Sequence, residues 1–245
     1  MTGLNDPKSR LIFALDVPSL DEAVSFVQKL DGSVGMFKVG LELFIKGGPP
    51  VLTAIRDHSD AEIFLDLKLH DIPATVERAV QSAAAHKARF LTVHCSGGDT
   101  MLRAAVIGAG DSGLQILGVT VLTNLGPDDH REELGYRKNL TLKDLTIVRA
   151  GMAENAGCAG VICSGLEVAA IRQNFQILTT VVPGIRQSES NLGGDDQKRV
   201  MTPKKAIQGG ADYLVVGRPI RDAADPKAAA DKIVQEIFEA LSGTK

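Results

Sequence analysis

The chain contains little cysteine. Only Cys95, Cys158 and Cys163 occur in 245 residues, and no two of them form a Cys-x-x-Cys pair. An odd number of scattered cysteines argues against a disulfide framework and against a cysteine-rich zinc site. We therefore expect a protein of a reducing, cytoplasmic setting.

The chain also lacks an excess of positive charge and a long apolar stretch. Its 27 lysine and arginine residues face 30 aspartate and glutamate residues, a formal net charge of -3. Such a balance predicts no basic surface for nucleic acid or anionic lipid, so an anionic ligand would have to be bound by local groups. Residues 1–10 are polar, without the apolar core of a signal peptide, and no uncharged apolar stretch approaches the length that spans a bilayer. We expect no membrane partner and no nucleic-acid partner.

Several common catalytic motifs are absent. There is no Gly-x-Gly-x-x-Gly after the first apolar segment, no P-loop and no Gly-x-Ser-x-Gly elbow. Ser164 precedes a glycine but has no base beside it in the sequence, and His58, His86 and His130 show no spacing typical of a zinc site. Dinucleotide binding, nucleoside-triphosphate binding and serine hydrolysis are therefore not supported, and no metal ligands are predicted.

What the chain does contain is a regular alternation of short apolar segments with longer amphipathic ones. The apolar, β-branched segments predict strands, and the alanine-rich segments between them predict helices. The predicted strands are 11–15, 35–39, 62–65, 90–93, 116–122, 160–163, 178–182 and 213–216, and the predicted helices include 20–30, 76–86, 142–156, 203–209 and 226–241.

Eight strand–helix units in one chain of this length favour the α/β class. They predict a single-domain (β/α)8 TIM barrel over residues 1–245, with an open doubly wound sheet as the alternative. The positions of polar residues favour the barrel, because they follow the strands at their carboxyl ends, which meet at one face of a barrel. These residues are Asp16, Lys38, Asp66, Lys68, His94, Thr123, Ser164, Pro183-Gly184 and Gly217-Arg218.

The most informative stretch is 66–75, which reads Asp-Leu-Lys-Leu-His-Asp-Ile-Pro-Ala-Thr. The period of a strand directs Asp66 and Lys68 to the same side, and Asp71 lies about one turn further on, where its carboxylate could return toward Lys68. Asp71 could instead cap the next helix, with Asp66 and Lys68 forming a solvated ion pair. The combination favours chemistry, since a lysine between two acids is a proton donor that stays charged.

Two further charged residues end strands that are otherwise apolar, Asp16 and Lys38. Because neighbouring strands lie roughly 4.8 Å apart, the order Asp16, Lys38, Asp66, Lys68 would alternate in sign along the barrel mouth. Alternation allows each charge to be paired while it is buried. The acids of this cluster would repel a carboxylate placed beside them.

The last part of the chain predicts a phosphate site. Gly217-Arg218-Pro219 follows the eighth strand, and Arg186 follows the seventh, which is where barrels usually bind phosphate. The stretch 184–197 is rich in Gly, Ser, Asp and Gln, and we interpret it as a mobile loop that could close over the phosphate with Gln197. An ordinary solvated arginine is the alternative for Arg186.

His94 ends the fourth predicted strand and could be a base or a ligand. A histidine that is hydrogen-bonded within the barrel rim is the interpretation we favour. The sequence assigns no role beyond packing to Ser164 or Cys95.

These residues together resemble the orotidine 5'-phosphate decarboxylase family, in its bacterial, single-function form. The family signature Asp-x-Lys-x-x-Asp-Ile-Pro-x-Thr is met by Asp66 to Thr75, and the segments 14–16, 37–40, 183–186 and 216–220 are similar to other family segments. The resemblance covers essentially the whole chain. One departure is Ala74, where many relatives have asparagine, but this position lies between the signature residues.

The resemblance implies decarboxylation of orotidine 5'-monophosphate to uridine 5'-monophosphate without a cofactor or metal. Lys68 would protonate C6 of the pyrimidine, and Asp66 and Asp71 would keep Lys68 cationic and crowd the substrate carboxylate. Asp16 and Lys38 would contact the ribose hydroxyls and complete the charge network, with Lys38 counted among the catalytic residues. The resemblance further implies that Thr123 meets the pyrimidine, that the phosphate is held by Arg186, Gln197, Gly217 and Arg218, and that a homodimer forms in which Asp71 and Thr75 reach the partner's site.

Two rival functions remain. The Asp-x-Lys-x-x-Asp core is shared with related barrels that act on sugar phosphates, including metal-dependent decarboxylases and hexulose-phosphate synthases, although the Ile-Pro-x-Thr extension separates them. A non-catalytic phosphate-binding module is the third class. The cluster of Asp66, Lys68 and Asp71 argues against it, because binding alone does not require acids set against an anionic ligand.

Overall fold

The computed structural model of the protein describes residues 6–126, 129, 140–186 and 199–243. Within them, eight parallel strands pair in sequence order, and β8 pairs with β1 to close a barrel. The strands are β1 (Leu11–Ala14), β2 (Met36–Gly40), β3 (Glu62–Leu69), β4 (Phe90–His94), β5 (Gln115–Val119), β6 (Gly160–Ile162), β7 (Thr179–Val182) and β8 (Tyr213–Val216). The predicted (β/α)8 fold is confirmed.

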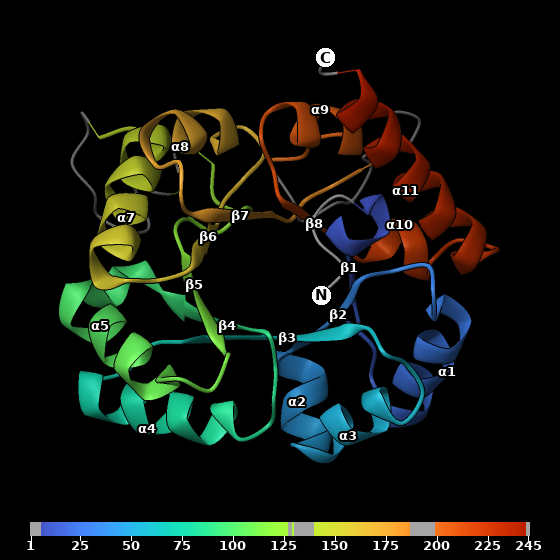
Figure 1. Ribbon diagram of the computed structural model, residues 1–245, viewed down its shortest axis with the longest axis horizontal. Coiled ribbons are helices and arrows are strands. Elements are labelled where there is room, and N and C mark those ends of the chain that lie inside the picture. The colour runs from blue at the N-terminus through green and yellow to red at the C-terminus, as the bar shows by residue number, and fades with distance from the viewer. Residues whose placement is uncertain (1–5, 127–128, 130–139, 187–198, 244–245) are drawn as a thin grey trace.

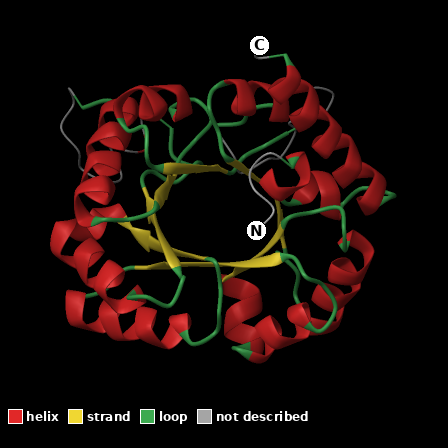
Figure 2. Cartoon of the chain, in the orientation of Figure 1, coloured by secondary structure: helices red, strands yellow, loops and turns green. Residues whose placement is uncertain are grey.

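Helices form an outer ring around the strands, as Figure 1 and Figure 2 show. They are α1 (Leu20–Leu30), α2 (Leu41–Gly47), α3 (Pro50–Arg56), α4 (Pro73–Ala84), α5 (Gly98–Ala109), α7 (Leu142–Ala156), α8 (Val168–Asn174), α9 (Pro203–Gln208), α10 (Arg218–Arg221) and α11 (Pro226–Ser242), with 3-10 turns η1 (Pro7–Arg10) and η2 (Cys95–Gly97). The sequence pattern did not predict α2, α3 and α8, which are only seven residues long. It also did not predict α5, whose first and next-to-last residues are glycine.

Short polar side chains start several of these helices. Ser19, Thr202 and Asp225 each accept a hydrogen bond from a backbone N–H in the first turn of α1, α9 and α11. At α7, Thr141 and Asp144 form a reciprocal capping box. Such caps satisfy N–H groups that lack a partner inside the helix.

The apolar core has two parts. A large layer lies between the strands and the helices, and a smaller cluster fills the inside of the barrel, with Phe64, Phe90 and Tyr213 among its members. The Phe90 ring meets those of Phe64 and Tyr213 edge to face, with centroids 6.0 Å and 5.3 Å away. Because side chains fill the interior, ligand space is left at the barrel ends rather than along its axis.

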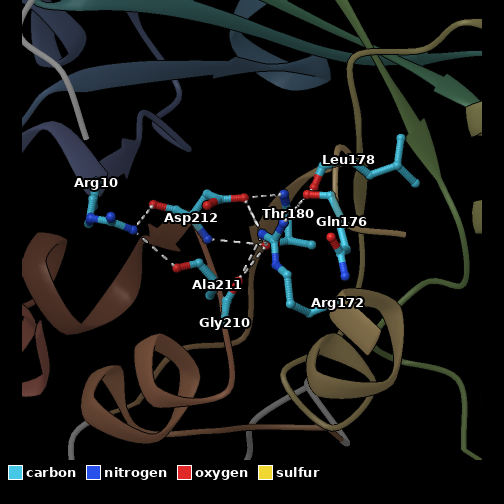
Figure 3. Close-up of polar contacts among 8 residues, drawn as sticks. All are labelled: Arg10, Arg172, Gln176, Leu178, Thr180, Gly210, Ala211 and Asp212. Atoms are coloured by element: carbon cyan, nitrogen blue, oxygen red, sulfur yellow. Dashed lines mark hydrogen bonds and ion pairs between the residues drawn. The ribbon is translucent and has the colours of Figure 1, made fainter. Parts of the chain in front are cut away.

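Polar contacts join the amino ends of β7 and β8 (Figure 3). The Asp212 carboxylate accepts from the Thr180 backbone N–H at 2.9 Å and pairs with Arg172 Nη2 at 2.5 Å. Arg10, just before β1, donates to the carbonyls of Ala211 and Asp212. These contacts tie the last strands of the barrel to the first, at the face opposite the carboxyl ends.

Two strand ends differ from the predicted ones by three residues or more. The fifth strand ends at Val119 rather than at residue 122, because the next carbonyls are taken by arginine side chains: Arg149 donates to Thr120, and Arg199 donates to Val121 and Leu122. The third strand continues to Leu69 through a register shift after Leu65.

The predicted mobile loop at 184–197 lies mostly outside the described residues. Only its first three residues, 184–186, are described, so its mobility and its closing role stay predictions.

Candidate active site

A cavity of about 540 Å³ opens at the carboxyl ends of the strands. Its volume is within the range of small-molecule sites. Eight of the predicted site residues line it together: Asp16, Lys38, Asp66, Lys68, Thr123, Arg186, Gly217 and Arg218. Residues more than 200 positions apart in the sequence therefore meet at one face, as the barrel prediction requires.

The charged residues at the base of the cavity form a chain of alternating sign. Lys38 Nζ lies 2.9 Å from Asp16 Oδ1 and 3.6 Å from Asp66 Oδ2. Asp66 Oδ2 also accepts from Lys68 Nζ at 2.7 Å. The Lys38 side chain is 9% exposed and that of Asp66 is 12% exposed, whereas that of Lys68 is 30% exposed. Lys68 is thus the ammonium of this chain that is more open to a ligand.

The two buried members keep their charges. Burial by itself lowers the pKa of Lys38, but the carboxylates of Asp66 and Asp16 outweigh burial and raise that pKa above its ordinary value. Burial likewise favours the neutral form of Asp66, but Lys38, Lys68 and a hydrogen bond from Thr92 hold its pKa below the usual range. Asp66 is therefore a fixed negative charge inside the cavity.

The backbone of β3 is adapted to present Asp66 and Lys68 together. Lys68 has a positive φ of 48°, which non-glycine residues rarely adopt. Its N–H donates to Thr92 Oγ1 at 2.9 Å, and Thr92 Oγ1 donates to Asp66 Oδ1 at 2.9 Å. The fully buried Thr92 of β4 therefore supports both residues. Sequence reasoning missed Thr92, although a polar residue inside an apolar strand was an available signal.

Cationic side chains also line the cavity from the segments after β7 and β8. Gly184, Arg186, Gly217 and Arg218 line it as predicted, and so does Arg221, which the sequence interpretation did not include in the site. Arg221 Nη1 donates to the Asp16 carbonyl at 3.0 Å, and its Nε pairs with Asp222 at 2.6 Å. Its spacing of three residues from Arg218 on a helix was the available signal.

Thr123 and the following Asn124 line the cavity from the segment after β5. Thr123 is buried. Asn124 was not predicted, and its position next to Thr123 was the only signal for it.

Two of the predicted site residues that the structure describes, Asp71 and Thr75, are not brought to the cavity. Asp71 is exposed, its carboxylate accepts from the Ile72 N–H at 2.6 Å, and no ion pair joins it to Lys68 within the described chain. Thr75 is half-buried on α4 and does not line the cavity. Gln197 lies outside the described residues. The expectation that Asp71 returns to Lys68 is thus not met within one chain, because the chain turns outward into α4.

The three residues without an assigned role are accounted for by packing and local contacts. The His94 ring is half-buried, and its centroid lies 5.5 Å from that of the His70 ring. The described contacts include no hydrogen bond of the His94 ring, so the predicted hydrogen bond within the barrel rim stays a prediction. Ser164 Oγ accepts from the Leu166 N–H at 3.2 Å. Burial raises the pKa of the Cys95 thiol to about 12, so this cysteine is not a nucleophile.

The described part of the chain holds neither a candidate metal cluster nor a candidate membrane helix. Among residues 6–126, 129, 140–186 and 199–243, no three His, Cys, Asp or Glu side chains group as metal ligands would. In the same part of the chain, no helix combines the length and apolar character that crossing a membrane requires.

Comparison with known proteins gives consistent results. Residues 9–233 match the model of the orotidine 5'-phosphate decarboxylase / HUMPS family. The orotidine 5'-phosphate decarboxylase of Desulfosudis oleivorans is 50% identical over 239 residues, which cover 96% of this chain and 95% of that protein. The enzyme of the same name from Rhodopseudomonas palustris is 46% identical and covers 97% of this chain and 98% of its own length.

A solved structure agrees with this match. The crystal structure of orotidine 5'-phosphate decarboxylase from Lactobacillus acidophilus superimposes with a TM-score of 0.80 at 37% identity, covering 93% of this chain and 98% of that one. Family model, full-length relatives and fold agree with the signature at Asp66 to Thr75, and the chain belongs to the orotidine 5'-phosphate decarboxylase / HUMPS family.

Proposed function

We propose that this protein decarboxylates orotidine 5'-monophosphate to uridine 5'-monophosphate and carbon dioxide in pyrimidine biosynthesis. The observation that carries the proposal is the pairing of Lys68 with Asp66 at 2.7 Å in a cavity that Arg186 and Arg218 also line. An anion fits beside these arginines, and a carboxylate beside Lys68 would meet the fixed charge of Asp66. Family membership and the names of the full-length relatives support the same reaction.

The reaction needs one bond to break and one proton to move. The bond from C6 to the carboxylate breaks, carbon dioxide leaves, and the electron pair stays on C6. Lys68 Nζ then gives its proton to C6, and solvent restores the proton on lysine. Asp66 keeps Lys68 charged before the transfer and repels the substrate carboxylate, an effect that is relieved as carbon dioxide leaves.

The other cavity residues bind and orient the nucleotide. Asp16 and Lys38 contact the ribose hydroxyls, and Thr123 contacts the pyrimidine. Gly217, Arg218 and Arg186 hold the phosphate, with Gln197 as a further predicted contact. Binding energy gained at the phosphate, remote from C6, contributes to placing the carboxylate against Asp66.

We further propose a cytoplasmic homodimer in which Asp71 and Thr75 complete the partner's site. Asp71 is exposed beside Ile72, an apolar side chain that is 66% exposed, and neither Asp71 nor Thr75 lines the cavity of its own chain. Residues of the signature that point away from their own site fit a role across an interface. The three cysteines are free and buried, which suits a reducing compartment.

A metal-dependent sugar-phosphate decarboxylase or aldolase is the alternative on the same barrel. The contacts of Asp66 disfavour it, because Oδ2 is occupied by Lys68 and Oδ1 by Thr92. An acid that is to bind a metal would need these oxygens.

The ultraviolet absorbance of orotidine 5'-monophosphate, followed with purified protein in EDTA, tests the proposal directly. We expect rapid loss of absorbance with the wild-type protein. For Lys68→Ala we expect less than about one percent of that rate, since the carbanion loses its proton source and nearest positive charge. A well-folded wild type that is inactive in EDTA but active with added magnesium on a sugar phosphate would favour the alternative.

Retained activity of Lys68→Ala above that level would remove Lys68 from the proton transfer. Circular dichroism and thermal unfolding of the variant serve as the folding control.

A further inference from the structure

Arg199 makes a set of buried contacts that the proposed chemistry does not use. The residue is 6% exposed. Its Nη1 pairs with Glu167 Oε1 at 2.8 Å, and its Nη2 donates to the carbonyls of Val121 and Leu122 at 3.1 Å and 3.0 Å. One guanidinium therefore joins the segment after β5 to the segment after β6.

The guanidinium of Arg199 and the backbone that follows it both connect to residues that line the cavity. Val121 and Leu122 directly precede Thr123 and Asn124, which line the cavity. The partner residues of Arg199 thus hold the wall of the cavity that faces the pyrimidine.

The backbone after Arg199 leads to the phosphate side. Two residues after Arg199, the backbone N–H of Met201 donates to the Gly184 carbonyl at 3.2 Å, and the Met201 carbonyl accepts from the Arg186 N–H at 2.9 Å. Gly184 and Arg186 line the cavity. Arg199 therefore connects the two parts of the cavity wall to which the proposed function assigns the pyrimidine and the phosphate.

The contact is poorly suited to stability alone. Glu167 is 5% exposed, and among the described residues neither Glu167 Oε2 nor Arg199 Nε has a hydrogen-bond partner. Burial raises the pKa of Glu167 even though Arg199 opposes this. Removing two charges from water costs free energy that an incompletely bonded pair recovers only in part. A role for the pair in placing the two walls would account for its presence.

We propose that Arg199 is a positioning residue that fixes the segment of Thr123 and Asn124 relative to the segment of Gly184 and Arg186. This inference rests on the proposed decarboxylase function. With the two walls fixed, phosphate binding at one end places the pyrimidine correctly at the other. A substrate without phosphate is not held at the phosphate end, so the fixed position of the two walls does not help to place its pyrimidine.

The test compares two substrates in matched variants. In Arg199→Lys the charge opposite Glu167 is kept, but an ammonium cannot reproduce the planar fork that reaches a carboxylate and two carbonyls together. Arg172→Lys is the control, because Arg172 also pairs with a carboxylate and donates to carbonyls, but at the opposite face of the barrel (Figure 3). Values of kcat/KM are measured for orotidine 5'-monophosphate and for the nucleoside orotidine.

We expect Arg199→Lys to lower kcat/KM for the nucleotide by about tenfold or more, the scale of a displaced binding group, while the value for orotidine changes by less than about threefold. Arg172→Lys should lower thermal stability and leave both values within about threefold of wild type. Equal losses for the two substrates, or no loss for either, would overturn the proposal. An inactive wild type would instead refute the decarboxylase function on which it rests.

A second variant covers the case in which Arg199→Lys does not fold. The double change Arg199→Met with Glu167→Met removes both buried charges, and apolar replacement of a buried ion pair is often tolerated. It also removes the guanidinium donors to the carbonyls of Val121 and Leu122, while the Leu125 N–H still donates to the Leu122 carbonyl at 3.1 Å. The same selective loss on the nucleotide is expected, and a double variant with the wild-type ratio of the two kcat/KM values would contradict the inference.

Discussion

Lys38 and Arg218 both line the cavity, but their surroundings differ. Lys38 lies between the carboxylates of Asp16 and Asp66 and is almost fully buried, so its charge is balanced by the protein itself. Arg218 begins α10 beside Gly217, where the missing side chain of glycine leaves the backbone open to a ligand. At the scale of single residues, we therefore expect the effect of a change at Arg218 to depend on the substrate phosphate, and the effect of a change at Lys38 not to depend on it.

For Arg218→Ala we expect a loss of transition-state stabilisation of about 3 kcal/mol, the scale of a charge-assisted contact to phosphate in a closed site. Values of kcat/KM for orotidine 5'-monophosphate measure this loss. Orotidine serves as the internal control and should be turned over by the variant nearly as well as by wild type. An unchanged kcat/KM for the nucleotide would remove Arg218 from the site.

His94 predicts a pH dependence of stability. Burial, then His70 and Lys68, lower the pKa of His94 from 6.5 to about 4. Between these values the unfolded chain binds a proton that the folded chain does not, so the free energy of unfolding falls as the pH falls from 6.5 to about 4. Above that window, the contribution of neutral His94 is fully present.

His94→Gln cannot titrate and should therefore lose less stability than wild type across that window. Urea unfolding at about pH 7.5, 6, 5 and 4.5 measures the difference, because these values run from above the ordinary pKa almost to the lowered one. Because the pKa of Asp66 is lowered by folding, the free energy of unfolding falls further at still lower pH, and both proteins share this loss. Parallel stability curves for the two proteins would show that the His94 pKa is not lowered by folding.

At the scale of elements, glycine distinguishes a close contact between strands from a free position in a helix. Gly160 starts β6, where an added Cβ would collide with the Thr179 carbonyl oxygen of β7 and lie 2.7 Å from Thr179 Cβ. Gly151 lies inside α7, where a Cβ would only touch the Phe175 ring at 3.5 Å. The same substitution should thus have opposite effects at these two places.

We expect Gly160→Ala to lower the free energy of unfolding by about 1–3 kcal/mol, because neighbouring strands of a closed barrel cannot move apart freely. Gly151→Ala should raise it by about 0.5–1 kcal/mol, since alanine is the better helix former. Chemical denaturation of both variants measures the two effects. Equal stabilities of the Gly160 variant and wild type would show that β6 and β7 can separate at this point.

At the scale of the whole molecule, the proposed dimer can be tested by mixing two inactive variants. Lys68→Ala lacks the proton donor, and Asp71→Asn lacks the acid proposed to come from the partner. In a hybrid dimer, one site would then combine an intact Lys68 with an intact Asp71 from the other subunit. Random reassociation of equal amounts should restore about a quarter of wild-type activity, because half of the dimers are hybrids and each has one complete site.

The outcome separates the two possible geometries of Asp71. If Asp71 acts within its own chain, no hybrid site is complete, and mixing restores nothing. Each variant alone, taken through the same unfolding and refolding steps, is the control for activity that either recovers by itself.

The sequence by itself determined the strands, the barrel and most of the charged cluster. Alternating apolar and amphipathic segments define a (β/α)8 chain, and a barrel places the carboxyl ends of all strands at one face, so Asp16, Lys38, Asp66 and Lys68 had to meet there. These inferences depend only on local periodicity and on the closure of a parallel sheet. The resemblance in 66–75 added the reaction.

Only the tertiary structure decided which groups support that cluster and which leave it. Thr92, Arg199 and Arg221 act through contacts between segments that are distant in the sequence, which no local pattern encodes. Arginine side chains take the carbonyls that follow β5, so the strand ends at Val119 although the apolar run continues. Asp71 turns outward because the chain enters α4 at Pro73, a matter of backbone direction rather than of residue spacing.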